Sequence, residues 1–310
     1  MPWRGPMPPS IDVELNAVIL AVSDEVPRVL TVSGPAGVPA LPSGRLDIRQ
    51  DRTLDRALRR WVLEQTGLRV GYVEQLYTFG DQNRHPEERA GGPRVLSIAY
   101  LALVREEVPS NGAGWRDVYA HFPLEDHRND RPGALAAEVL PRIEQWIGTA
   151  AGADEARLRR ERAQAAFGLD TTPWDPVRAL ERYELLYEVK AAAEASGGMA
   201  AGQPMVLDHR RMLAAALGRL RGKLTYRPVV FEMLPEQFTL LQLQSLVESL
   251  AGTRLHKQNF RRLVERGGLV EGTGKLSAST GGRPPELFRF RREVLIERPR
   301  PGLGVPGGRS

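Results

Sequence analysis

Residues 44–68, GRLDIRQDRTLDRALRRWVLEQTGL, decide how the rest of the chain is interpreted. The stretch opens on a glycine turn and continues as an amphipathic helix, with Thr53 as the N-cap and Gly67 where a left-handed glycine ends a helix. Apolar residues recur at helical spacing and predict one buried stripe, made of Leu54, Leu58, Trp61, Val62 and the aliphatic part of Leu63. Periodicity alone indicates a surface helix packed on a sheet.

The order of these residues resembles the Nudix box, the loop-helix-loop signature of hydrolases that act on nucleoside diphosphates linked to another group. The second half of the motif aligns well. Gly67 and Leu68 take the closing glycine-aliphatic pair, Arg60 takes the motif arginine, Val62 the aliphatic position, and Glu64 the first of two adjacent glutamates.

The other acids of the motif are absent from this chain. Arg52 stands where the first glutamate belongs, Trp61 replaces the glutamate after the arginine, and Gln65 replaces the second of the adjacent pair. Two extra residues also separate Gly44 from Arg52. The chain therefore resembles the frame of the box without its carboxylates.

Carboxylates of that kind hold Mg²⁺, a hard cation that prefers oxygen ligands and often bridges a site to substrate phosphates. Guanidinium groups repel a divalent cation and bind a diphosphate directly. Four of them gather on this helix and at its entry, namely Arg52, Arg56, Arg59 and Arg60. The sequence thus favours binding without cleavage, and the alternative is a rearranged metal site supplied by residues such as Asp47, Asp51 or Glu64.

Composition sets the remaining bounds. The 310 residues are enough for two modest domains, and 42% hydrophobic with 26% charged residues is ordinary for a soluble chain. The chain has no cysteine, so thiol catalysis, disulfides and cysteine zinc sites are excluded. Its first ten residues lack a signal-peptide core and no stretch approaches the ~20 apolar residues of a membrane span, so we expect a cytoplasmic protein without membrane contact.

Charge is distributed unevenly along the chain. The net charge is +5, yet residues 208–295 alone carry sixteen Lys or Arg against eight Asp or Glu. This asymmetry points to an anionic polymer as the partner of the C-terminal third, although a solvated basic face would give the same count.

The N-terminal half predicts a mixed sheet. Residues 11–22 and 28–34 alternate or run apolar and predict two strands joined by a turn, followed by the box helix. Residues 70–81 predict a further strand or strand pair, and the continuous apolar run in 93–106 is typical of a buried central strand. This order is compatible with the mixed-sheet α/β/α sandwich that the Nudix resemblance implies.

A long polar loop, GDQNRHPEERAGGPR, lies between the last two of these strands, and such loops over a binding face often carry function. Its surroundings supply aromatic rings, a carboxylate and cations suited to a base, a ribose and phosphates: Tyr77, Phe79, Asp81, Arg84 and Arg94. The competing interpretation places the aromatics in the core and leaves the rest solvated. His85 and His209 have no partners at metal-ligand spacing, so no metal site is assigned.

The pattern changes in residues 126–204, where the sequence predicts three helices separated by glycine and proline, one of them highly charged. We expect an insertion that packs on the preceding domain or forms a dimer contact, or else an inert spacer. Residues 205–224 predict an amphipathic helix with Asp208 near its start and basic residues in its last turns, which suits the helix dipole.

The C-terminal third predicts three helices followed by two strands around a glycine-rich turn, the layout of a winged helix-turn-helix. Its second helix begins at the N-cap Thr239 and ends at Gly252, and its third carries exposed amides and cations suited to base edges and phosphates. The residues predicted to contact DNA are Thr239, Lys257, Gln258, Asn259, Arg261, Arg262 and, in the glycine-rich turn, Arg283. A winged helix that docks protein is the alternative.

A degenerate Nudix box joined to YTFGD, to DHRRMLAAALGRLRGKLTYRPVVFEMLP and to the winged helix pattern resembles the Nudix-related transcriptional regulators, repressors of NAD metabolism and of some sugar pathways. The resemblance covers roughly residues 11–122 and 205–291, and the insertion departs from it. It implies a homodimer on a palindromic operator, tuned by ADP-ribose or a related nucleotide. The predicted segments are a disordered N-terminus (1–10), a Nudix-like ligand-sensing domain (11–125), a helical insertion (126–204), a connecting helix (205–224), a winged helix DNA-binding domain (225–295) and a flexible tail (296–310).

We therefore predict a ligand-responsive transcriptional regulator, without cofactor or catalysis, in which occupancy moves the connecting helix. The predicted ligand-binding residues are Arg52, Arg59, Arg60, Glu64, Tyr77, Phe79, Asp81, Arg84 and Arg94. One alternative is an active hydrolase of ADP-ribose or another nucleoside diphosphate with an accessory winged helix, and another is an adaptor that binds RNA or protein.

Overall fold

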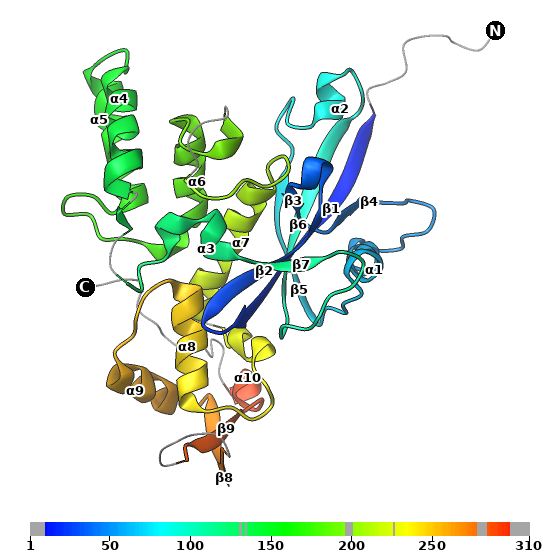
Figure 1. The fold of residues 1–310 in the computed structure, drawn as a ribbon, viewed down its shortest axis with the longest axis vertical. Helices are drawn as coiled ribbons and strands as arrows, with labels where there is room; N and C mark the ends of the chain where they lie inside the picture. Colours follow the sequence, from blue (N-terminus) through cyan, green and yellow to red (C-terminus); the bar gives the residue numbers. More distant parts are fainter. Residues whose placement is uncertain are drawn as a thin grey trace.

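The structure is a computed structural model that describes residues 10–129, 132–133, 135–195, 201–225, 227–277 and 284–297. Within these ranges the chain is built on a mixed sheet of seven strands, with main order β3-β2-β1-β6-β5, while β4 pairs with β1 and β7 with β2 (Figure 1). Strands β1 and β6 are parallel, and the other pairings are antiparallel. The strands are β1 (Ile11–Ser23), β2 (Val26–Ser33), β3 (Pro39–Ala40), β4 (Ser43–Arg45), β5 (Tyr72–Phe79), β6 (Arg94–Leu103) and β7 (Gly114–Asp117).

Helices cover both faces of this sheet because β1 is buried on both sides. Successive strand residues point to opposite faces, so Leu15, Ala17 and Ile19 pack towards α1 (Leu54–Thr66), while Val18 and Leu20 join the core that contains α7 (His209–Leu224). Figure 1 shows α1 and α7 on opposite sides of the sheet. The predicted α/β/α sandwich is therefore confirmed, and α7, expected as a connecting helix, forms one of its outer layers.

The stretch between the sheet and α7 is helical, as its sequence predicts. Helices α4 and α5 lie side by side away from the sheet, whereas α6 packs against α7 (Figure 1). The elements of this stretch and of the loops before it are η1 (Pro35–Gly37), α2 (Pro86–Arg89), α3 (Val118–His121), η2 (Pro123–Glu125), η3 (Leu135–Val139), α4 (Leu140–Gly148), α5 (Ala153–Phe167), η4 (Pro176–Arg178), α6 (Ala179–Glu188) and η5 (Ala193–Ala195).

Helix α7 begins later than its amphipathic pattern predicts. Leu207 has a φ of 52°, in the left-handed region that a right-handed helix cannot include. Asp208 occupies the N-cap position but makes no capping bond, and its Oδ1 pairs with Arg84 from the polar loop. The helix therefore starts at His209, and its first turn is attached to the loop between β5 and β6.

The C-terminal residues form the predicted winged helix. Thr239 caps α8 in a reciprocal arrangement with Gln242, and Gly252 ends that helix with a φ of 71°. Phe238 pairs with Phe288, which adds a short third strand segment to the wing hairpin. The first of the three predicted helices is a short 3₁₀ helix, η6. The elements of the winged helix and of the residues after it are η6 (Val229–Met233), α8 (Leu240–Ala251), α9 (Lys257–Gly267), β8 (Val270–Leu276), β9 (Glu286–Phe290) and α10 (Val294–Glu297).

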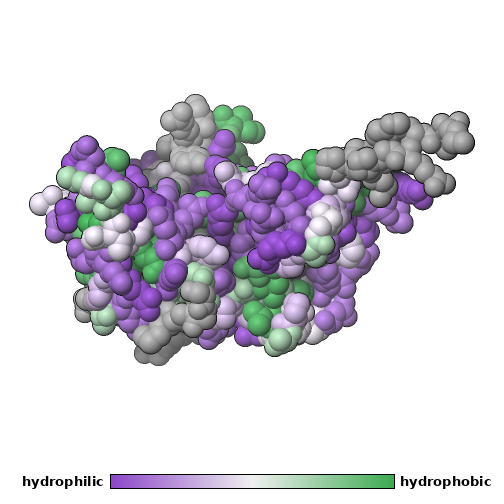
Figure 2. All heavy atoms as spheres, turned by 90° about the horizontal axis from the view of Figure 1, so that it is seen from above, coloured by the Kyte–Doolittle hydropathy of each residue, from purple (hydrophilic) through white to green (hydrophobic). Residues whose placement is uncertain are grey.

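Most of the described chain shares one hydrophobic core. It extends from the α7 face of the sheet through α3 and α6 into α8 and the winged helix. The surface is different. The face that carries α2 and the outer ends of α4 and α5 is mostly hydrophilic, with hydrophobic residues in separate small patches (Figure 2). Among the described residues, no helix has the length and apolar character needed to cross a membrane.

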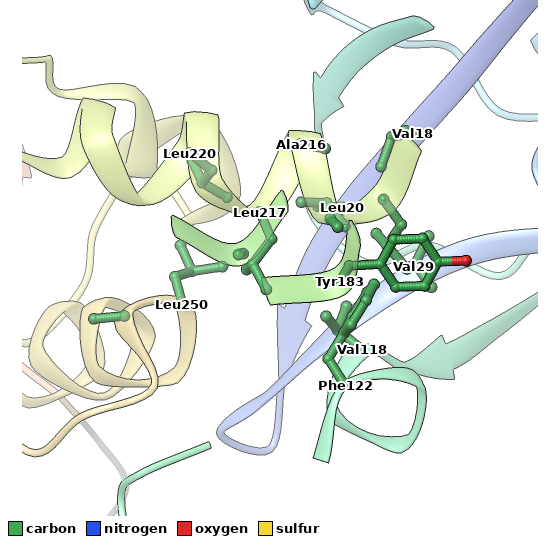
Figure 3. Close-up of a cluster of buried hydrophobic side chains, with 14 of the residues drawn as sticks. Val18, Leu20, Val29, Val118, Phe122, Tyr183, Ala216, Leu217, Leu220 and Leu250 are labelled. Atoms are coloured by element: carbon green, nitrogen blue, oxygen red, sulfur yellow. The ribbon is translucent and has the colours of Figure 1, made fainter. Parts of the chain in front are cut away.

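Figure 3 shows how the layers meet. Val18, Leu20 and Val29 from the sheet lie near Ala216 and Leu217 of α7. Val118 of α3 and Phe122, the residue after that helix, lie alongside, and Leu220 and Leu250 bring α7 to α8. Because this packing is continuous, a displacement of α7 relative to the sheet changes contacts of α8 as well.

A buried histidine begins α7. The backbone N–H of Leu41 donates to His209 Nδ1 at 2.9 Å, so this nitrogen is unprotonated in the folded protein. Burial, followed by the positive charges of Arg84 and His85, lowers the pKa of His209 to about 4.

Stability should therefore fall as the pH drops. The pKa of a histidine in an unfolded chain is ~6.5. Between that pH and about 4, His209 therefore binds a proton in the unfolded chain but not in the folded protein. We expect His209 to account for a loss of roughly 2 kcal/mol in the free energy of unfolding between about pH 7 and pH 5. Urea unfolding at both pH values would measure it, with His209→Gln as the comparison. An equal loss in the variant would contradict this assignment.

Candidate functional site

The box helix α1 has the predicted ends. Thr53 accepts a hydrogen bond from the Arg56 N–H at 3.2 Å, and Gly67 is left-handed with a φ of 72°. Leu58 and Val62 are buried as expected, but the prediction for Leu63 is wrong, because its side chain lies 39% exposed on the outer face of the helix. The helix therefore packs on the sheet by a narrower stripe than its sequence predicts.

Two residues at positions where a Nudix box carries metal-binding acids, Trp61 and Gln65, make contacts within the protein instead. The ring of Trp61 lies over Gly44 so closely that a Cβ at residue 44 would sit 2.1 Å from it, and the indole N–H donates to the Arg45 carbonyl. The Gln65 amide bonds both the N–H and the carbonyl of Ser43, at 3.0 and 2.7 Å. Trp61 and Gln65 thus fix the turn before the helix instead of presenting carboxylates.

Two of the predicted diphosphate arginines on α1 are already paired. Arg60 pairs with Asp51 at 2.9 Å, and this hydrogen bond lowers the pKa of the Asp51 carboxyl. Arg59 pairs with Asp55 at 2.8 Å and donates to the carbonyl oxygens of residues 70 and 71. Arg52 is exposed and its side chain bonds no other described residue, whereas Glu64 is half exposed, 3.5 Å from Arg60.

The polar loop between β5 and β6 is attached to α7 by two ion pairs. Arg84 is buried, pairs with Asp208 and donates to Ser97 of β6. Asp81 is exposed and pairs with Arg211 at 2.6 Å. Both predicted ligand residues therefore also connect the loop to the first turn of α7.

Arg94 closes the base of the same loop. Its exposed guanidinium donates two hydrogen bonds to the Gly80 carbonyl, one of them at 3.1 Å. The loop is thus held at its base by Arg94 and over its length by Arg84 and Asp81.

The two predicted stacking aromatics have different environments. Phe79 is 1% exposed and belongs to the core, so of the two rings that the sequence offered for stacking on a base, Tyr77 is the accessible one. Tyr77 is 56% exposed and meets Phe79 edge to face, with ring centres 5.1 Å apart. Both residues follow the bulge that β5 has between Gln75 and Tyr77, so their side chains share one face of the sheet. Tyr77 is the more exposed of the two, and it borders an open cavity together with Leu180 of α6 and Arg219 of α7.

The predicted ligand residues therefore do not form one site. Arg59, Arg60 and Glu64 border a cavity of about 420 Å³ beside α1. Asp81 and Arg84 border a cavity of about 740 Å³ on the α7 side of the sheet. The larger cavity also includes residues of α5 and α6 that the sequence left without a role, and the only sequence signal for them is the aromatic face of α6, with Tyr183 and Tyr187.

Helix α9 carries most of the predicted DNA contacts. Phe260 and Val264 are buried against the domain, and the opposite face is polar. On that face every predicted side chain is exposed, and none bonds another described residue: Lys257, Gln258, Asn259, Arg261 and Arg262. Free guanidinium, ammonium and amide groups on one helix are the groups that bind phosphates and base edges.

Two other predicted DNA contacts have a different outcome. Thr239 is 8% exposed and its hydroxyl accepts from the Gln242 N–H, so the structure gives it the role of a helix cap. Arg283 lies outside the described residues, as do Gly281 and Gly282 of the same turn.

The C-terminal end of α8 is bonded by residues from outside the winged helix. The last carbonyl groups of a helix lack partners within it, and here Tyr119 donates to Ser249, Arg221 to Leu250 at 3.0 Å, and the His127 N–H to Gly252 at 2.7 Å. A Cβ at residue 252 would lie 2.2 Å from the Glu125 carbonyl, so only glycine allows this approach.

A buried ion pair supports these contacts. Glu125 accepts two hydrogen bonds from Arg182 of α6, at 2.6 and 2.9 Å, and a further one from Arg221 of α7. Burial alone would raise the pKa of the Glu125 carboxyl, but the charges of Arg182 and Arg221 outweigh it, so the pKa is lowered. We call Tyr119, Glu125, His127, Arg182 and Arg221 the α8 junction.

These features define a class of protein: a Nudix-like α/β/α sandwich whose outer layer continues into a winged helix. Comparison with known proteins makes this more specific. Residues 230–290 match the family model of the NrtR DNA-binding winged helix domain, which agrees with the winged helix that these residues form.

Relatives extend the similarity over most of the chain. The chain is 24% identical over 251 residues to the ADPR responsive transcriptional repressor NtrR of Acinetobacter baylyi (strain ATCC 33305 / BD413 / ADP1). The alignment covers 81% of this chain and 69% of that protein. The crystal structure of Shewanella oneidensis NrtR complexed with a 27mer DNA has a TM-score of 0.57 at 21% identity, over 92% of this chain and 95% of that one. The structure of a MutT/nudix family protein from Enterococcus faecalis has a TM-score of 0.55 at 17% identity, over 93% and 90%. These structures share the fold.

Substitutions on α9 should separate phosphate contacts from base contacts. We expect Arg261→Ala to weaken binding to all DNA sequences and to reduce the salt dependence by about one counterion. Gln258→Ala should instead lose roughly 1 to 3 kcal/mol of discrimination between the selected sequence and its variants. Fluorescence anisotropy with selected genomic fragments at several salt concentrations measures both.

Arg160→Ala is the matched control. Arg160 is exposed on α5 and bonds no other described residue. Figure 1 shows α5 well apart from α9. An equal loss of DNA affinity in Arg160→Ala would contradict the assignment of the α9 face.

Proposed function

We propose that this protein is a ligand-responsive transcriptional regulator, a repressor whose Nudix-like domain binds ADP-ribose or a related nucleotide and thereby changes the affinity of the winged helix for operator DNA. The observation that carries the proposal is the α8 junction. Tyr119 of α3, the backbone N–H of His127 and Arg221 of α7 supply hydrogen-bond partners for the end of α8, the helix that precedes the DNA-binding helix. A change in the ligand-binding half therefore acts on the orientation of α8 and α9.

The route begins at the polar loop. Asp81 and Arg84 are bonded to Arg211 and Asp208 at the start of α7, and Arg221 near the other end of α7 bonds α8. A ligand that competes for these loop side chains changes the forces on one end of a single helix whose other end contacts α8.

Binding without hydrolysis is part of the proposal. Mg²⁺ needs several oxygen ligands in octahedral geometry, and the box offers Arg52, Trp61 and Gln65 at acid positions. Trp61 and Gln65 also make contacts that hold the turn at Gly44. The name of the Acinetobacter relative supports ADP-ribose as the effector, and no cofactor is invoked.

Several further features belong to the same proposal. We expect a cytoplasmic homodimer that binds a palindromic operator, because two copies of one reading helix related by a twofold axis match two half-sites of inverted sequence. Genes of NAD metabolism are the expected targets, since ADP-ribose derives from that cofactor. Selection of bound genomic fragments would identify the operator.

The decisive test measures operator affinity with and without saturating ADP-ribose, at one salt concentration. We expect a change of about 5- to 150-fold, which corresponds to a coupling free energy of ~1 to 3 kcal/mol. Calorimetry on the same preparation would establish ligand binding independently. Binding of ADP-ribose that leaves the operator affinity unchanged would contradict the coupling.

The same preparation distinguishes the regulator from a hydrolase. With Mg²⁺ and ADP-ribose we expect no AMP release above the uncatalysed background. Release at an ordinary enzymatic rate of about 1 s⁻¹ or faster, abolished by Glu64→Gln, would replace this proposal with the hydrolase.

A further inference from the structure

The 740 Å³ cavity lies between the Nudix-like domain and the insertion. One wall is the polar loop 81–89, another is formed by α5 and α6, and the start of α7 forms its base. The lining includes Arg89 from the loop, Arg162 of α5, Tyr187 and Glu184 of α6, and Arg211 of α7. The insertion thus supplies about as much of this cavity as the domain to which the sequence resemblance applies.

Most charges of the lining are already paired within the protein. Arg211 bonds Asp81 and Glu184, at 2.6 and 2.7 Å. Arg162 pairs with Glu188 across the α5–α6 contact. These pairs hold the walls together, and they leave only some of the polar groups available to a ligand.

The groups without partners have complementary chemistry. The Nε–H of Arg84 and the Oδ2 of Asp208 are both buried with no hydrogen-bond partner among the described residues, although Nη1 and Oδ1 of the same two side chains are paired. Arg89 is exposed and its guanidinium bonds no other described residue. Tyr187 is 50% exposed, so its ring can be covered by a flat group.

Each of these groups fits one part of a nucleotide. A sugar hydroxyl is both donor and acceptor, so it can satisfy a carboxylate oxygen and an N–H at the same time. A free guanidinium binds phosphate oxygens, often with two hydrogen bonds. A partly exposed tyrosine ring provides a stacking surface for any base.

We propose that this cavity is the effector site and takes a ribose-containing nucleoside diphosphate, with the α6 residue Tyr187 against its base, Arg89 on its phosphates, and the Arg84–Asp208 pair at a ribose hydroxyl. This assignment rests on the proposed function and replaces the α1 groove as the place of binding. The cavity beside α1 has in Arg69 a guanidinium without a described partner, but Arg59 and Arg60 are engaged by Asp55 and Asp51, and its described lining includes no aromatic ring for a base.

The location also explains how occupancy reaches the DNA-binding domain. Asp208 and Arg211 belong to the N-cap and first turn of α7 and line the cavity. A diphosphate near Arg211 competes with Asp81 for the same guanidinium. Binding therefore alters the loop contacts of the helix that bears Arg221 of the α8 junction.

The test compares matched substitutions in the full-length protein by calorimetric titration with ADP-ribose. Tyr187→Ala and Arg89→Ala change the cavity, while Tyr77→Ala and Arg52→Ala make the same chemical changes at the rival positions outside it. Tyr77 is exposed to a similar extent as Tyr187, and Arg52, like Arg89, is exposed without a described partner. We expect each cavity variant to weaken binding about tenfold or more and each rival variant by less than about twofold.

Other outcomes are equally informative. Weaker binding in Tyr77→Ala or Arg52→Ala, with unchanged binding in both cavity variants, would overturn this site and leave the proposed function in place. Failure of the unsubstituted protein to bind ADP-ribose would overturn the effector assignment and the site together. Operator binding by each variant without ligand, together with its circular dichroism spectrum, shows that a weakened variant is folded.

Discussion

The buried carboxylate of Glu125 joins three parts of this protein: the segment after α3, helix α6 and helix α7. Glu125 lies between Arg182 of α6 and Arg221 of α7, and all three side chains are almost fully buried. Removing one partner of such a group leaves an uncompensated charge, which typically costs about 3 to 5 kcal/mol. The sheet, the insertion and α7 are therefore held together by charge in addition to apolar packing.

The same residues connect this arrangement to the winged helix. Arg221 bonds both Glu125 and the Leu250 carbonyl, and a cation at a helix C-terminus is favoured by the helix dipole. At the other end of α7, Asp208 pairs with Arg84 from the polar loop. A helix with ligand-side contacts at its beginning and DNA-side contacts at its end is a physical path between two sites, with no need for a flexible linker.

Sequence patterns predicted the elements of this fold but not their junctions. The caps at Thr53, Gly67 and Gly252 are local signals, and the apolar run of β6 identified it as an interior strand, although β1 is the middle strand of the sheet. Glu125 gives no such signal, because its partners lie 57 and 96 residues away. The same limit applies to the candidate site, where the burial of Phe79 depends on long-range packing and the two cavities lie on opposite sides of the sheet.

The central claim is that hydrogen bonds to the end of α8 transmit ligand binding, and Tyr119→Phe tests it most directly. This change removes the hydroxyl that donates to Ser249 and keeps the ring. ADP-ribose affinity should stay within about twofold, while the ADP-ribose-induced change in operator affinity should shrink by about fivefold, the equivalent of one hydrogen bond of ~1 kcal/mol. An undiminished change in operator affinity in Tyr119→Phe would contradict the account.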